Sequence, residues 1–223
     1  LIIKMGKEEI RRRLLGITAI AAEYCVTLEN ASEAEREEFI ASMLRLLPRI
    51  YIDFNDLTLP DKYPVRHGDC EGDGCCGHDD CHGEECHCHS CEQDDDVEDF
   101  DEYSPVSLEE DDEDRKYYPS YIDEDYYESV RRHIEALLGP DDVFLETFEE
   151  DMKYSDTPIA ASISECLADI FQPLYNFISI VKDTDGDELE GAYRECKENF
   201  VAYWSQTLCN VLRALNHVYY NRI

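Results

Sequence analysis

The side chains best suited to chemistry gather between residues 67 and 93. This stretch reads HGDCEGDGCCGHDDCHGEECHCHSCEQ and holds seven of the eleven cysteines and five of the seven histidines in the chain. Thiolate and imidazole groups are ligands that zinc, nickel, cobalt and copper ions prefer. The sequence therefore predicts a segment that binds soft or borderline transition metal ions. Twelve side chains are its candidate ligands: His67, Cys70, Cys75, Cys76, His78, Cys81, His82, Cys86, His87, Cys88, His89 and Cys91.

The composition of the stretch indicates metal binding, but the spacing of its cysteines does not fix the number of sites. Five-residue steps run from Cys76 to Cys91, with Cys88 added, so that residues 86–91 form a CxCxxC cluster. Glycines between the ligands allow tight backbone turns, and neighbouring carboxylates attract cations. The paired CxxC units of a zinc finger are absent from this stretch. The metal and its stoichiometry therefore stay open.

The stretch has two other interpretations. A low-complexity insertion could bind metal only incidentally. A disulfide knot is disfavoured, because the remaining cysteines lie on apolar helix faces and the charged start of the chain does not fit a secretion signal. We expect a cytoplasmic protein, since the cytoplasm keeps thiols reduced. In composition alone, the stretch resembles the Cys/His-rich tails of nickel metallochaperones of the peptidyl-prolyl isomerase type.

The charge distribution bears on the partners of the chain. The formal net charge is −33 over 223 residues. Residues 69–114 include 21 acidic side chains and no Lys or Arg. Such a field repels nucleic-acid phosphates and anionic lipids and attracts metal ions or a basic protein partner. We expect no nucleic-acid partner and no membrane association, because no apolar run approaches the roughly 20 residues of a membrane helix.

Apolar residues before this segment recur at helical spacing. A first helix is predicted over about residues 5–29, with the stripe Ile10, Leu14, Ile17, Ala21, Tyr24 and Leu28. Ser32 and Glu35 form a capping box that predicts the start of a second helix, in which Pro48 should cause a kink. The loop between them is short, so the two helices should pack antiparallel.

Four more helices are predicted after residue 119. The third begins at Ser120 or Asp123 and stops at Gly139, and the fourth covers about residues 141–152 with Phe144, Leu145 and Phe148 packed inward. The fifth starts with Thr157 as N-cap and Pro158 as first helical residue. A turn over residues 183–188 precedes the sixth helix, which covers about residues 187–220. Its predicted stripe is Leu189, Tyr193, Cys196, Phe200, Tyr203, Thr207, Val211, Leu215 and Val218, with Trp204 beside it as a core anchor.

These elements predict an all-α fold, a helical bundle of about six helices. Residues 1–60 form an N-terminal helical hairpin, and residues 120–223 supply four helices that complete the same bundle. Residues 61–119 form a long, acidic, Cys/His-rich insertion between helices two and three, which we expect to be flexible and to stay outside the core.

Four stretches of the helical parts carry a family resemblance. They are EYCVTLEN (23–30), LLPRIY (46–51), DMKYSDTPIAASISECLADI (151–170) and ENFVAYWSQTLCNVLRALN (198–216). The chain resembles an uncharacterised all-helical family, a domain of unknown function found mainly in Bacteroides-type bacteria. Ser205 stands where that family is expected to have glycine. The resemblance implies an α-helical cytoplasmic protein with a variable acidic segment and no catalytic residues, and the Cys/His array lies outside its pattern.

Carboxylates in the predicted fifth helix offer another site. Glu165 and Asp169 lie one turn apart, after Asp151 and Asp156, and could bind a divalent ion or act as acid and base. No Glu-x-x-His pair, HExxH, Walker loop or GxSxG motif accompanies them. A polar face with a capped turn is therefore the favoured interpretation of these four carboxylates.

Three functions follow from these patterns. We favour a non-enzymatic helical module whose insertion sequesters or delivers metal. The alternative is a protein-interaction scaffold that uses its acidic loop, with metal incidental. The second alternative is a carboxylate-based enzyme on helices five and six, which requires a pocket at Glu165 and Asp169.

Overall fold

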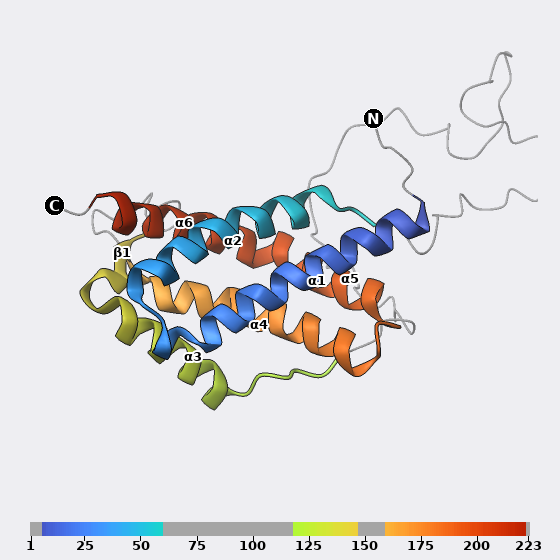
Figure 1. The fold of residues 1–223 in the computed structure, drawn as a ribbon, viewed down its shortest axis with the longest axis horizontal. Coiled ribbons are helices and arrows are strands. Elements are labelled where there is room, and N and C mark those ends of the chain that lie inside the picture. The colour runs from blue at the N-terminus through green and yellow to red at the C-terminus, as the bar shows by residue number, and fades with distance from the viewer. Residues whose placement is uncertain (1–5, 60–117, 147–158, 222–223) are drawn as a thin grey trace, which may run out of the picture. The chain divides into compact units, whose positions relative to one another are not determined.

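The computed structural model describes residues 6–59, 118–146 and 159–221. This part of the chain is almost entirely α-helical, with one short two-stranded sheet (Figure 1). All of these described residues fall in one compact unit. The all-α prediction is therefore confirmed. The twelve predicted metal ligands lie outside the described residues.

The first two helices form a hairpin. Helix α1 (Lys7–Glu29) buries the predicted apolar stripe, and α2 (Arg36–Asp56) contains Pro48 as predicted. The capping-box prediction is wrong, because Ser32 lies in a 3₁₀ turn, η1 (Ala31–Glu33), and the N-cap residue Glu35 makes no side-chain capping bond. The side chain of Ala31 is fully buried, which fixes this turn in the core. Ser32 therefore lies within the turn, several residues before α2 begins, and cannot cap that helix.

Helix α3 (Glu124–Leu138) has the predicted ends. The Asp123 carboxylate accepts a hydrogen bond from the backbone N–H of Tyr126 at 2.8 Å, as an N-cap does. Gly139 ends the helix with φ of +58°, a conformation that glycine adopts without strain. Val130, Ile134 and Leu138 form the buried face.

The prediction of a fourth helix over residues 141–152 is wrong for residues 141–146, the part that the structure describes. A 3₁₀ turn, η2 (Gly139–Asp142), leads into strand β1 (Val143–Leu145), which pairs antiparallel with β2 (Ala160–Ser162). The buried carboxylate of Asp142 explains the difference. It accepts hydrogen bonds from the Ser164 backbone N–H at 2.7 Å and from the Ser162 and Ser164 hydroxyls at 3.0 and 2.9 Å. These bonds tie the start of β1 to the end of β2, and Leu145 stays exposed.

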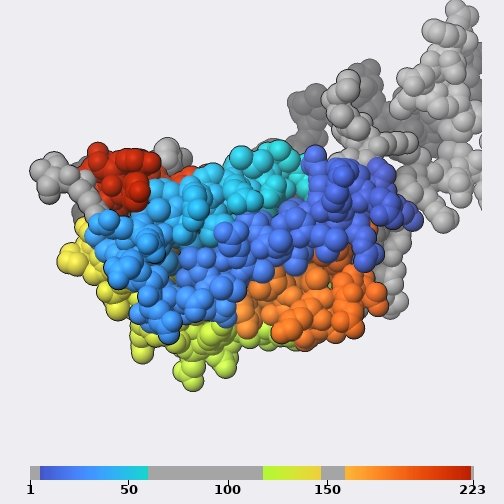
Figure 2. Space-filling model, in the orientation of Figure 1, coloured from blue at the N-terminus to red at the C-terminus, as the bar shows by residue number. Residues whose placement is uncertain are grey.

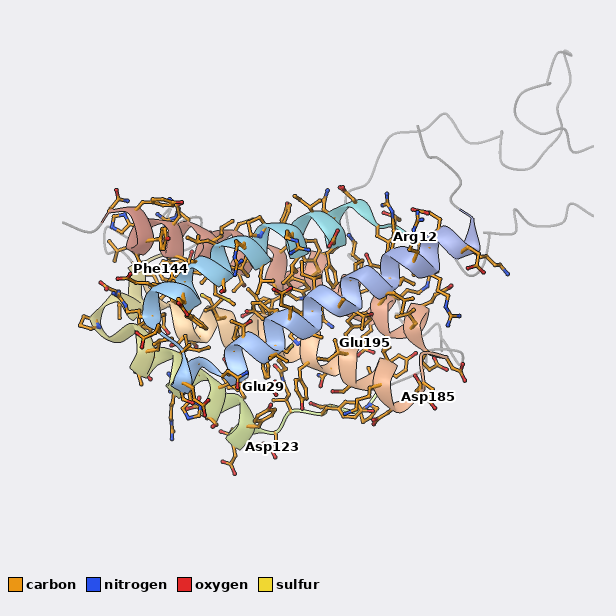
Figure 3. The ribbon with its side chains drawn as sticks, viewed as in Figure 1. Arg12, Glu29, Asp123, Phe144, Asp185 and Glu195 are labelled. Carbon is orange, nitrogen blue, oxygen red and sulfur yellow. The ribbon has the colours of Figure 1, made fainter. Side chains whose placement is uncertain are left out.

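The next helix starts later than predicted. Helix α4 (Ile163–Asp183) is capped by Ser162, whose hydroxyl accepts from the Glu165 backbone N–H at 3.1 Å. The predicted cap, Thr157, lies outside the described residues, and Ile159 precedes the helix. After α4 the chain turns at Asp185 and Gly186, where φ is +49° and +84°, so the predicted turn is confirmed (Figure 3).

The last helical run contains a break that the sequence pattern did not reveal. It consists of α5 (Leu189–Asn199), a π-helical turn η4 (Phe200–Trp204) and α6 (Ser205–Tyr220). A π turn holds an extra residue, so it rotates the following helix relative to an uninterrupted one. The buried face therefore passes from Phe200 to Trp204, which is fully buried, while Tyr203 is 57% exposed. Trp204 anchors the core as predicted, with its ring centroid 4.6 Å from that of Phe200 and 5.0 Å from that of Phe54.

Both blocks of helices share one core. Helix α4 packs against α1, α3, α5 and α6, and α2 packs against α1 and α6. Figure 2 shows α1 and α2 covering much of one face of the described bundle. No described helix is both long and apolar enough to cross a membrane.

Candidate functional site

The bundle holds the chain firmly just before the Cys/His-rich stretch. The hydroxyl of Tyr193 on α5 donates to the backbone carbonyl of Leu57 at 2.7 Å. Lys197, one turn later on α5, donates to the backbone carbonyl of Phe54. Leu57 and Leu59 are both buried. Helix α5 therefore fixes the end of α2 and its C-cap residue, Leu57.

The chain is held again where its description resumes. We call residues 118–122 the strap, because they run in extended form beside α4 and α5 before α3 begins (Figure 1). The Tyr118 hydroxyl donates to the Glu188 carboxylate at 2.7 Å, and the Tyr121 backbone N–H donates to the Asn176 side-chain oxygen at 2.8 Å. Partial burial and the bond to Glu188 raise the pKa of Tyr118, so this phenol remains a donor at neutral pH.

A glycine on α5 makes room for the strap. A Cβ atom at Gly191 would collide with the Tyr118 hydroxyl and lie 3.2 Å from a Glu188 carboxylate oxygen. The bond between Tyr118 and Glu188 therefore depends on a residue without a side chain at this position. Tyr193 of α5 and Glu188, the N-cap residue of that helix, thus each hold one side of the segment that carries the predicted ligands, and Asn176 of α4 adds a second contact to the strap.

The four cysteines of the bundle are free thiols. Cys25, Cys166 and Cys196 are buried, and Cys209 is exposed. Burial raises the pKa of each, that of Cys166 to about 12. A thiol must lose its proton to bind a metal or react, so these four are poor ligands at neutral pH. Among the described residues no group of three or more His, Cys, Asp or Glu side chains is placed to hold a metal ion.

The structure gives Asp169 a packing role. One of its carboxylate oxygens accepts from the Tyr127 hydroxyl of α3 at 2.6 Å, and the other accepts from the Tyr203 hydroxyl of η4 at 2.8 Å. Burial and these bonds raise the pKa of both phenols, that of Tyr203 to about 12. Asp169 therefore joins three helical segments, while Glu165 is exposed. Asp151 and Asp156 lie outside the described residues.

Two hollows of the described surface are lined by other residues. One, of about 140 Å³, lies between the strap, α4 and α5. The other, of about 500 Å³, is a shallow groove between α2 and α6. Neither is lined by Glu165 or Asp169, so the pocket that a carboxylate enzyme requires is not found at either place.

Sequence reasoning missed the polar groups that hold these elements together. The buried Asp142 and the pair of Tyr118 with Glu188 were not singled out. The run YYPSYIDEDYY (117–127) does contain a signal. The hydroxyls of Tyr118, Tyr126 and Tyr127 donate to carboxylates, and a hydrogen bond to the Asp183 carboxylate raises the pKa of Tyr121. Phenols close to an acidic bundle surface are natural donors to it.

The family of the chain is settled by a match over residues 96–221. The matching model describes a domain of unknown function, DUF5063. The chain belongs to the DUF5063 family. The DUF5063 match leaves out residues 1–95, which include α1, α2 and all twelve predicted ligands. The Cys/His array therefore lies outside the family pattern, as predicted, and the family pattern includes the acidic residues just before the strap.

A solved structure has a similar fold. The crystal structure of protein BF1032 from Bacteroides fragilis matches with a TM-score of 0.61 and 24% sequence identity. The match covers 95% of this chain and 94% of that one. At this identity the likeness shows the fold alone. A search of curated proteins found no match to the chain.

Proposed function

We propose that this DUF5063 protein is a non-enzymatic helical module whose segment at residues 61–119 binds zinc, nickel, cobalt or copper. The observation that carries the proposal is the density of ligands, since twelve Cys and His side chains fall within residues 67–91. The 21 acidic residues between 69 and 114 would concentrate cations around these ligands. Sequestration or delivery of metal in the reducing cytoplasm fits such a segment.

The bundle supports this proposal as an anchor. Three of its four thiols, those of Cys25, Cys166 and Cys196, are buried, which raises their pKa and separates them from metal in solution. Tyr193 and Tyr118 attach the chain to the region of α5 on either side of the ligand-bearing residues. Because the predicted ligands lie outside the helical core, metal ions could bind and leave without disturbing the packing of the bundle.

Elemental analysis tests the proposal. The full chain is purified without a histidine tag and compared with a variant in which the seven cysteines between residues 70 and 91 are replaced by serine. Cys209→Ser, the exposed thiol of the bundle, serves as the matched control. We expect metal in the unchanged chain and in the control and a large loss in the seven-serine variant. Equal metal content in all three would overturn the proposal.

A second function is favoured by the extent of the family match. The acidic residues between 96 and 114 lie within the DUF5063 match, whereas the Cys/His array does not. A scaffold that docks a basic protein through this acidic segment would therefore be the role shared with the family. Its complex should survive chelation of metal and weaken steeply with added salt, because surface charges are screened. A complex lost on chelation at constant salt would favour the metal-binding role.

A further inference from the structure

The outer face of α1 lies opposite the core and stays exposed in the described bundle (Figure 2). At 100° per residue, one narrow stripe along this face consists of Arg12, Leu15, Ala19, Glu23 and Val26. We call these five residues the outer stripe. Two of them are large apolar side chains that remain in contact with water, since Leu15 is 50% exposed and Val26 is 53% exposed. The outer stripe therefore offers apolar contact along about four turns of helix.

The charges of the outer stripe differ in sign at its two ends. The Arg12 side chain is 76% exposed, and its guanidinium pairs with Glu9 of the same helix (Figure 3). A guanidinium has five N–H donors, so it can bind a second carboxylate as well. Glu23 is exposed and lies roughly 17 Å farther along the helix. A surface that is basic at one end and acidic at the other is complementary to a second copy of itself turned end to end.

The hairpin of α1 and α2 carries little of the negative charge of the chain. Residues 6–59 hold seven Lys and Arg and ten Asp and Glu side chains, a formal charge of −3, whereas the whole chain carries −33. At physiological ionic strength the Debye length is about 8 Å, so more distant charges are largely screened. A second copy can therefore approach α1 although the chain as a whole is strongly acidic.

We propose that the outer stripe binds a second copy of this chain in a twofold dimer, with the two α1 helices antiparallel. The register sets Arg12 of each copy at the level of Glu23 of the other, so symmetry forms the same ion pair twice. It also brings Leu15 within one residue of Ala19 of the other copy, and the small alanine side chain lets the two helices approach closely. The interface uses only the described hairpin and does not depend on metal binding.

Sedimentation equilibrium of the full chain tests whether two copies associate. The protein is measured up to millimolar concentration at physiological salt, with a chelator and a reductant present so that neither metal ions nor disulfides link the Cys/His-rich stretches. We expect a reversible equilibrium between monomer and dimer in the micromolar range, because a stripe on one helix makes an interface at the small end of the specific range. A chain that stays monomeric throughout would overturn the proposal.

Charge reversal tests the register. Arg12→Glu should weaken the dimer about tenfold, because symmetry replaces attraction by repulsion at both ion pairs. Glu23→Arg should weaken it to a similar degree, and the combination of Arg12→Glu with Glu23→Arg should restore the affinity to within about threefold of the unchanged chain. Arg132→Glu on α3 makes the same change of net charge at a side chain that is 70% exposed, and it should leave the dimer unchanged.

A substitution in the middle of the outer stripe tests the apolar contact. Leu15→Glu should also weaken the dimer about tenfold or more, while circular dichroism shows an unchanged fold, because the side chain is half exposed in the monomer. A dimer that Leu15→Glu and Arg12→Glu both leave intact would lie on another face and would refute the site. A double charge reversal that associates as weakly as the single variants would refute the antiparallel register.

Discussion

The side-chain hydroxyl of Tyr24 on α1 donates a hydrogen bond to the backbone carbonyl of Leu167 on α4 at 2.9 Å. Both residues are fully buried. This bond joins the N-terminal hairpin to the central helix of the C-terminal block across 143 positions of sequence. Burial raises the pKa of Tyr24 well above its ordinary value, so the phenol stays protonated and remains a donor.

Loss of the Tyr24 hydroxyl should be tolerated better than loss of the Tyr193 hydroxyl. The Leu167 carbonyl lies inside α4, so it keeps its backbone hydrogen bond within the helix when the Tyr24 hydroxyl is removed. The Leu57 carbonyl lies one residue beyond the end of α2, so it has no such helical bond when the Tyr193 hydroxyl is removed. Tyr24→Phe should therefore lower the free energy of unfolding by about 0.5–1 kcal/mol and Tyr193→Phe by about 1–2 kcal/mol. Urea unfolding measures both, and the reverse order would contradict this account.

Gly191 and Tyr118 should show strong coupling in a double-mutant cycle. Gly191→Ala forces the Tyr118 hydroxyl away from Glu188, which offsets the gain of roughly 1 kcal/mol that alanine brings to a helix interior. In a Tyr118→Phe background there is no hydroxyl to displace, so the same substitution should stabilise the protein. Urea unfolding of the four proteins gives the coupling, and an equal effect of Gly191→Ala in both backgrounds would exclude it.

The π turn should allow the deletion of one residue. Removing the exposed Val201 converts η4 into an ordinary α-helical turn and leaves α5 and α6 facing the core as before. Removing the exposed Gln206 from α6 should instead rotate every later residue by about 100° and turn Val211 and Leu215 away from the core. Circular dichroism and thermal unfolding should show a folded Val201 deletion and an unfolded Gln206 deletion. Two deletions of equal effect would contradict the register argument.

Stability should fall in alkaline solution. In the folded chain burial raises the pKa of Cys166 and of Tyr203 to about 12. Below their ordinary pKa values of about 9 and 10 both groups are protonated in the folded and unfolded chain, and their contribution is fully present. As the pH rises further the unfolded chain loses these protons first, so the free energy of unfolding decreases until about pH 12.

Urea unfolding between pH 8 and 11 tests this dependence at one residue. Tyr203→Phe should reduce the decline above about pH 10, because it removes one of the titrating phenols. Tyr220→Phe, at the exposed end of α6, is the matched control. A decline of the same steepness in Tyr203→Phe and in the unchanged chain would count against the role of the bond to Asp169.

The apolar stripes of the long helices could be predicted because each helix contains several repeats of the 3.6-residue period. Ile10, Leu14 and Ile17 on α1 and Val130 and Ile134 on α3 are buried as expected. The short strands could not be predicted in this way, since three residues do not establish a period. Val143 and Leu145 are apolar but exposed. The bonds that tie the two strands together at one end come from Asp142, which lies about twenty residues from its serine partners in sequence.

The position of Tyr203 shows a second limit. A stripe with steps of three and four predicts Tyr203 inside and Trp204 beside it, and the extra residue of the π turn reverses their places. The same rotation presents Tyr203 to Asp169, an interaction that local sequence does not reveal. For the metal ligands the sequence remains the source of the prediction, because all twelve lie outside the described residues.

The hairpin of α1 and α2 lies outside the DUF5063 match but packs on α4 and α6, which lie within it. A polypeptide trimmed to residues 96–221 would lose Leu14, Met43 and Phe54, and their apolar partners would face water. Such a fragment should aggregate or stay molten, whatever its similarity to its relatives. The family match begins at residue 96, and this is not a place where the protein can be cut.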